Sequence, residues 1–122
     1  MKIETVQQNG QTIAVITGQT PVLTGTQSAL DLLMAARYEA ATSRVAIEKS
    51  AVAEEFFVLG TRLAGEILQK FVNYHGKLAV FGDFSQYTSK PLRDFIRESN
   101  QGKDVFFVTT REEAIERLAS AE

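Results

Sequence analysis

The fold is decided by residues 77–109, which read KLAVFGDFSQYTSKPLRDFIRESNQGKDVFFVT. Two short apolar runs, Lys77–Gly82 and Asp104–Thr109, flank a segment in which Leu92 and Ile96 recur at helical spacing. Apolar runs of this length between polar residues are typical of strands that are buried on both faces. The stretch therefore predicts a strand, a helix and a strand, which is the repeating unit of a parallel sheet.

Capping residues mark the ends of the helices in this part of the chain. Ser89 can cap the middle helix, whose first turn contains Pro91, and the Asn-Gln-Gly sequence at residues 100–102 can end it. Downstream, Thr110 and Glu113 have the spacing of a capping box in front of a last helix. The region after residue 76 is therefore predicted to alternate between strands and helices.

A β-hairpin is expected at the N-terminus. The segments Ile3–Val6 and Gln11–Thr17 flank Asn9 and Gly10, a pair that readily takes the positive φ angles of a type I′ turn. The following segment, residues 18–25, contains two glycines, a proline and two threonines, so it is predicted to be a loop.

A helix and a strand are expected next. Ser28 and Asp31 have the spacing of a capping box, and the apolar periodicity after them predicts a helix that runs to about Ala41. The segment Arg44–Glu48 then alternates as a short strand does.

Residues 53–74 carry an apolar stripe at helical spacing, which predicts a long helix. Gly60 interrupts the stripe, so a break there, with Thr61 capping a second helical piece, is the alternative. The complete order predicts a single α/β domain with a mixed, mostly parallel sheet, an N-terminal hairpin and crossover helices.

Composition limits the class of protein. The chain has 122 residues, 44% of them hydrophobic, which is the size of one domain with one core. It contains no cysteine, which excludes disulfides, thiolate metal sites and thiol nucleophiles. We find no signal peptide and no run of roughly 18 apolar residues, so we expect a cytoplasmic protein with no membrane partner.

Charge and motif spacing exclude further classes. Thirteen basic and fifteen acidic residues are interspersed along the chain, whereas a nucleic-acid partner calls for clustered cations. A single histidine and scattered carboxylates lack the spacing of metal ligands, and the glycines match no nucleotide-binding pattern. We therefore expect no nucleic acid, no metal and no other cofactor.

Four runs carry a resemblance to a known family: AGEILQKFVNY at 64–74, KLAVFGDFS at 77–85, LRDFIRESNQGK at 92–103 and VFFV at 105–108. They resemble the bacterial domain-of-unknown-function family 4180 over nearly the whole chain, and that family implies no activity.

The predicted element order is also similar to that of STAS domains, which include anti-sigma-factor antagonists and transporter cytoplasmic domains. The STAS-like order implies a regulatory module, and in the antagonists it implies a phosphorylatable Ser or Thr at the start of the helix after the central strand. Ser50 occupies the comparable place here, without the Asp-Ser-Ser-Gly surroundings of those proteins.

Candidate site residues follow the predicted strands. Polar residues occur after three strand ends, at 48–50, 83–85 and 109–111, and ligands of open α/β sheets bind beyond such ends. The loop 83–90 lies next to a helix N-terminus, whose free amides favour an anion. The candidate ligand-binding residues are Arg62, Asp83, Ser85, Tyr87, Ser89, Lys90 and Arg111. In the alternative interpretation, Ser89 only caps the helix, Asp83 satisfies a turn and Arg62 is a solvated charge.

A catalytic triad of His75, Asp83 and Ser85 is opposed by geometry. His75 precedes the strand that Asp83 follows, and five or six extended residues span roughly 17 to 20 Å. We therefore assign no catalytic residue.

Three functions are ranked from these observations. The first is a regulatory or protein-interaction module, with a homodimer as one form, in which Phe56 and Phe57 contribute an interface although both also suit a core. The second is a small-molecule or anion-binding domain that uses the loop 83–90. A hydrolase built on this loop is the least favoured, because no activating base is evident.

Overall fold

The N-terminal hairpin starts the sheet in the computed structural model, which describes residues 1–122. Asn9 and Gly10 have φ angles of 53° and 76°, as a type I′ turn requires. They connect β1 (Lys2–Gln8) to β2 (Gln11–Thr17) in antiparallel pairing, with Val6 opposite Ile13. The predicted hairpin is confirmed.

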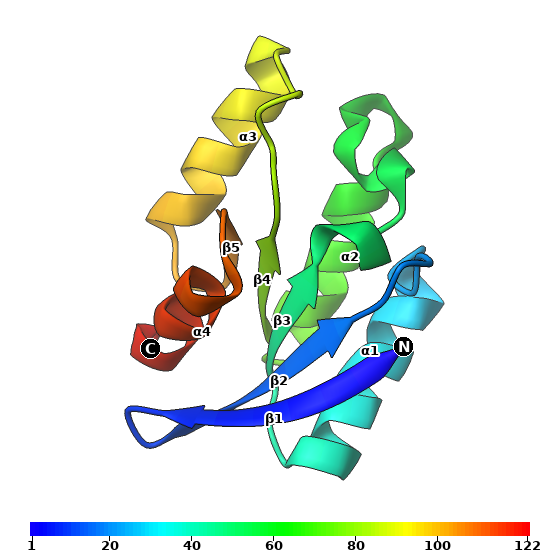
Figure 1. The fold of residues 1–122 in the computed structure, drawn as a ribbon. Helices are drawn as coiled ribbons and strands as arrows, with labels where there is room; N and C mark the ends of the chain where they lie inside the picture. The colour runs from blue at the N-terminus through cyan, green and yellow to red at the C-terminus, as the bar shows by residue number, and fades with distance from the viewer.

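Three further strands continue the sheet in parallel. These are β3 (Arg44–Glu48), β4 (Lys77–Phe81) and β5 (Val105–Val108), and the strand order is β1-β2-β3-β4-β5 (Figure 1). The predicted α/β domain with a mixed, mostly parallel sheet is confirmed.

The strand order decides where the helices lie. Each new strand is added on the same side of the sheet, so right-handed crossovers place α1 (Thr26–Ala40), α2 (Leu63–Asn73) and α3 (Lys90–Gln101) on one face. After β5 the chain crosses to the other face as α4 (Arg111–Ser120). In Figure 1, α4 lies in front of the sheet, and α1 and α2 lie behind it.

Each face of the sheet has its own core. Behind the sheet, 22 buried residues of the strands, of α1, α2 and α3 and of their connections form one cluster, which includes Ile47, Val80 and Phe107. In front of it, a smaller cluster of 11 residues, including Ala79 and Phe106, packs under α4. Because neighbouring strand residues point to opposite faces, β3, β4 and β5 are apolar apart from Arg44, Glu48 and Lys77 at their ends.

The first helix begins earlier than the capping pattern predicts. Its N-cap is Gly25, and Ser28 lies in the first turn, where its Oγ accepts hydrogen bonds from the backbone N–H of Gly25 at 2.9 Å and of Thr24 at 2.8 Å. Ser28 therefore satisfies backbone groups upstream of the helix and is not the cap, which corrects the prediction by three residues.

The long helix predicted over 53–74 is shorter in the structure. Short 3-10 turns occupy Lys49–Ala51, Glu54–Phe57 and Leu59–Thr61, and only Leu63–Asn73 is α-helical. Backbone hydrogen bonds tie residues 51–53 to residues 22–23, so this part of the chain is held extended. The alternative, a break near Gly60, is closer to the structure.

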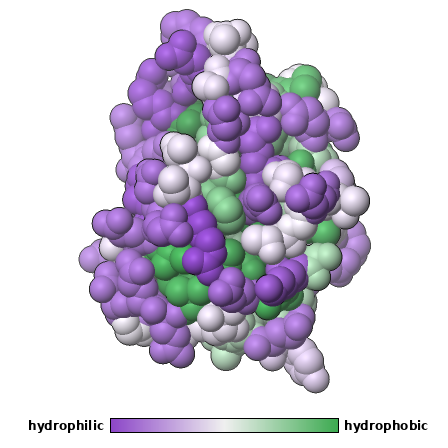
Figure 2. All heavy atoms as spheres, in the orientation of Figure 1, coloured by the Kyte–Doolittle hydropathy of each residue, from purple (hydrophilic) through white to green (hydrophobic).

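Most of the face in Figure 2 is hydrophilic, and hydrophobic residues gather in the region that α4 and its neighbouring strands occupy in Figure 1. None of the helices combines the length and the apolar character that crossing a membrane would require.

Candidate functional site

The predicted strand ends converge on one hollow beyond the sheet. It has a volume of about 450 Å³, and we call it the rim pocket. Its lining comes from the ends of β3, β4 and β5: Glu48, Lys49, Ser50, Phe81, Gly82, Asp83, Gln86 and Thr109. The chain turns to one face of the sheet after β4 and to the other after β5, so this edge includes the topological switch point at which α/β sheets bind ligands.

Asp83 and Ser50 of the rim pocket are already engaged within the protein. The carboxylate of Asp83 accepts a hydrogen bond from the N–H of Ser85 at 2.9 Å, and hydrogen bonding by Ser85 holds the pKa of Asp83 below its ordinary value. The hydroxyl of Ser50 donates to the carbonyl of Gly18 at 2.8 Å. Asp83 therefore organises the turn, as the alternative interpretation proposed.

Lys49 is held in place by aromatic rings. Its Nζ lies 5.0 Å from the ring centre of Tyr87 and 5.5 Å from that of Phe57, and 3.9 Å from the carboxylate of Glu54. Gly82 makes room for it, because a Cβ at this position would lie 2.6 Å from the Cβ of Lys49. The one cation of the rim pocket is thus balanced by neighbours that the protein supplies.

The loop between β4 and α3 is anchored through Tyr87. The ring of Tyr87 stacks on Phe57 with centroids 5.0 Å apart, and its hydroxyl donates to Glu54 at 2.7 Å. Burial and the hydrogen bond to Glu54 raise the pKa of Tyr87 above its ordinary value of 10.0. Phe84 adds a second anchor, since its ring lies edge-on to Phe107 at 5.8 Å.

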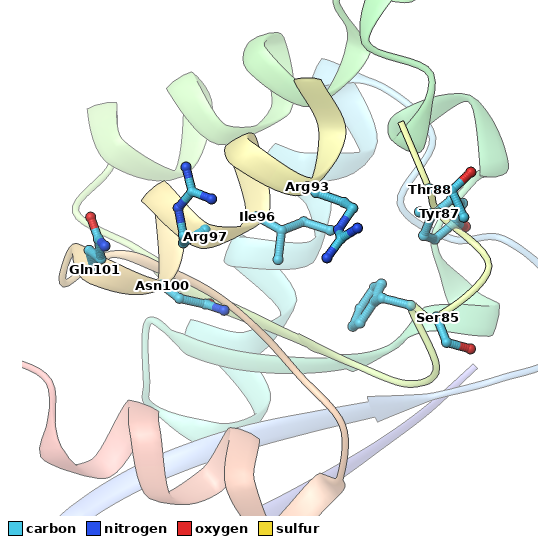
Figure 3. Close-up of a pocket in the computed structure, with 9 residues that line it drawn as sticks. Ser85, Tyr87, Thr88, Arg93, Ile96, Arg97, Asn100 and Gln101 are labelled. Carbon is cyan, nitrogen blue, oxygen red and sulfur yellow. The ribbon is translucent and has the colours of Figure 1, made fainter. Parts of the chain in front are cut away.

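A larger hollow lies on the other side of this loop, between the loop and α3 (Figure 3). We call it the arginine pocket, and its volume is about 660 Å³. Its lining residues are Phe84, Ser85, Tyr87, Thr88, Arg93, Ile96, Arg97, Asn100 and Gln101. The lining therefore combines two cations, several hydrogen-bonding groups and an apolar floor, and it contains no carboxylate.

Arg93 is the unpaired cation of this pocket. It is exposed, it forms no ion pair, and its guanidinium makes no hydrogen bond to the protein. Figure 3 shows its side chain extending from α3 toward the loop that carries Ser85. Arg97, one turn further along α3, is paired with Asp94 at 2.9 Å.

Asp94 also neutralises Lys90, with a distance of 2.6 Å between Nζ and Oδ2. This pairing lowers the pKa of Asp94 and raises that of Lys90. Lys90 lines a smaller hollow of about 380 Å³ that shares Thr88, Arg93 and Arg97 with the arginine pocket. Its charge is therefore already compensated, although it lies nearby.

Asn100 fixes the position of the wall formed by α3. Its side-chain amide donates to the carbonyl of Phe107 at 3.0 Å and accepts from the N–H of the same residue at 2.7 Å. The side chain thus pairs with the free edge of β5 as a neighbouring strand would.

The remaining candidates lie elsewhere. Ser89 caps α3 and Arg111 bonds Glu4 at 2.8 Å, while Arg62 is an exposed residue in the left-handed conformation before α2. None of these three lines the rim pocket or the arginine pocket.

Phe56 and Phe57 are core residues. They are 0% and 4% exposed, so neither offers a surface to a partner, and the interface expected there is corrected. Both pack on Phe107, which belongs to the strand that they cover.

Sequence reasoning located the loop but missed Arg93 and Arg97. A signal for them existed, because two arginines four residues apart on a predicted helix lie on one face. The pattern could not show that this face is the one that meets the loop.

One protein family matches the chain: its sequence model, described as "Domain of unknown function (DUF4180)", covers residues 8–118. The match includes every residue of the two pockets. No curated protein and no solved structure matches the chain.

Proposed function

Since this chain belongs to the DUF4180 family, whose description assigns no activity, we propose its function from the pockets: a domain that binds a small anion in the arginine pocket. The observation that carries the proposal is Arg93, a guanidinium at a concave site with no acceptor from the protein. Its planar set of donors matches a carboxylate or a phosphate in a bidentate arrangement.

Neighbouring groups support an anion at Arg93. Ser85 and Thr88 line the pocket from the loop, and Arg97, which is paired with Asp94, lines it from the next turn of α3. The pocket's volume lies within the range of about 300 to 1,000 Å³ that is usual for small-molecule sites. The rim pocket is the weaker candidate, because Lys49, Ser50 and Asp83 already have partners.

Binding fits this lining better than catalysis does. Acid–base chemistry needs a group that changes protonation near neutral pH, and the lining offers hydroxyls, amides and guanidinium groups. Because the pKa of Tyr87 is raised, its hydroxyl stays protonated at neutral pH and does not act as a base there.

We therefore propose that the domain acts as a regulatory module whose occupancy is read by a protein partner or a second copy of the chain. Light scattering with and without a bound anion would test this, because the mass of a monomer in both conditions would exclude the second copy.

The binding proposal is tested by nuclear magnetic resonance titration with inorganic phosphate and benzoate. We expect amide signals of residues 85–101 to shift, and Arg93→Gln to weaken the binding of the anion that shifts them by about tenfold, because a charged hydrogen-bonding pair is lost. Arg62→Gln is the matched control, since it removes an exposed arginine outside the pocket.

Two results would contradict the proposal. If neither anion shifts the signals of residues 85–101, the proposed site is wrong. If Arg93→Gln and Arg62→Gln weaken anion binding equally, the effect comes from net charge and not from the pocket.

A further inference from the structure

We propose that the arginine pocket selects an amphipathic anion, in which one carboxylate or phosphate group is attached to an aryl or acyl body. This inference rests on the proposed function and adds the class of ligand. It follows from the floor of the pocket, which is apolar and is held rigid by the core beneath it.

The floor consists of Phe84 and Ile96, with the ring of Tyr87 beside them. All three are partly buried and pack against the larger core. Phe84 lies 5.8 Å from both Phe57 and Phe107, so core rings on two sides hold it in place. These side chains therefore cannot move into the core, and the apolar part of a ligand would cover the surface that they expose to water.

Charge and apolar surface are interleaved along α3. Ile96 and Arg97 lie three and four residues after Arg93 on α3, and Figure 3 shows Ile96 between the two arginines. An anionic group at Arg93, beside Ser85 and Thr88, leaves the body of the molecule over Ile96 and Phe84. Gln101 at the far end of the pocket marks how far such a body can extend.

An inorganic ion would use only part of this site. Arg93 is exposed, so an ion pair with it is screened by water and by itself supports only weak binding. Apolar contact adds to it, since covering about 55 Å² of apolar surface raises an affinity about tenfold. We therefore expect the apolar body of a ligand to determine how tightly it binds, and its charged group to determine its orientation in the pocket.

The test compares matched probes by calorimetry or nuclear magnetic resonance titration. Acetate, benzoate and 2-naphthoate share a carboxylate and differ in apolar size, while 2-naphthamide keeps the body and removes the charge. Inorganic phosphate and 2-naphthyl phosphate form the second arm, which distinguishes a phosphate from a carboxylate head group. We expect the dissociation constant to fall at least tenfold from acetate to 2-naphthoate, or from inorganic phosphate to 2-naphthyl phosphate, and 2-naphthamide to bind at least tenfold more weakly than 2-naphthoate.

Two variants separate the contribution of apolar contact to binding from that of charge. Ile96→Ala should weaken the binding of the tighter naphthyl probe by about three- to tenfold and leave inorganic phosphate unchanged, because only apolar contact is lost. Arg93→Gln should weaken both naphthyl anions. Val72→Ala is the control for Ile96→Ala, since Val72 is an exposed valine on α2, and thermal melting verifies that each variant is folded.

The outcomes separate the inference from the function on which it rests. If inorganic phosphate binds through Arg93 as tightly as 2-naphthyl phosphate, and acetate as tightly as 2-naphthoate, the amphipathic class is wrong and the anion site stands. If no anion binds, both are wrong. If the naphthyl probes bind but neither variant weakens them, they occupy another place and the inference is overturned.

Discussion

Gly82 shows how a single residue determines the shape of the rim pocket. The side chain of Lys49 passes over the backbone of Gly82 so closely that a Cβ there would lie 2.6 Å from the Cβ of Lys49 and 3.3 Å from its Cδ. We expect Gly82→Ala to destabilise the protein by about 1–3 kcal/mol, as overpacking does. Urea unfolding measures the effect. Gly60→Ala is the control, because a Cβ at Gly60 has no neighbour within 4 Å, and an equal loss in both variants would contradict the steric cause.

Tyr87 makes the free energy of unfolding decrease as the pH rises above 10. Its folded-state pKa is raised above the ordinary value of 10.0, chiefly by burial and then by Glu54. Below pH 10 both the folded and the unfolded chain hold the proton, so the contribution is fully present there. Above pH 10 the unfolded chain releases the proton while the folded chain retains it, and the free energy of unfolding decreases. We expect Tyr87→Phe to lose less stability than the wild type between pH 9 and pH 11 in denaturant titrations. Parallel curves for the two proteins would be inconsistent with this role.

At the scale of elements, α3 is connected to the sheet edge by Asn100. The amide of this side chain satisfies both backbone groups of Phe107 that face away from β4, and Phe107 is only 4% exposed. We expect Asn100→Ala to cost about 1–3 kcal/mol, because a buried N–H and a buried carbonyl lose their partners. Chemical denaturation measures the loss, and Gln101→Ala, one exposed residue further along, is the control.

The same variant links the element to the pocket. Because Asn100 also lines the arginine pocket, loosening α3 should broaden the amide signals of residues 90–101 in nuclear magnetic resonance spectra. Unchanged signals together with unchanged stability would mean that the apolar contacts of Leu92 and Phe95 position α3 without Asn100.

At the scale of the whole molecule, the strand order explains why the two pockets adjoin. Since the strands are added in one direction, the β4–α3 loop is the last connection on the side of α1, α2 and α3, and no further crossover helix covers α3 beyond β5. The loop therefore has the β3 end on one side and the open flank of α3 on the other. Its aromatic residues Phe84 and Tyr87 line the arginine pocket, while Asp83 and Gln86 of the same loop line the rim pocket.

The sequence by itself determined those features that depend on neighbouring residues. The turn at Asn9 and Gly10, the caps at Ser89 and Thr110, and the apolar strands β3, β4 and β5 all follow from local conformational preference and from periodicity. Parallel order then follows from the alternation of elements, and with it the meeting of the strand ends at one edge. This explains why the rim pocket and the loop 83–90 could be predicted.

Only the tertiary structure decided which side chains remain available for binding. Lys90 and Arg93 both appear in sequence as cations near a loop, yet Asp94 neutralises the first and not the second. Phe56 and Phe57 both became core because residues 51–53 are tied to residues 22–23, a contact that no local pattern encodes. The physical reason is the same in these cases: pairing and burial depend on segments distant in sequence, whereas turns, caps and periodicity depend on a few adjacent residues.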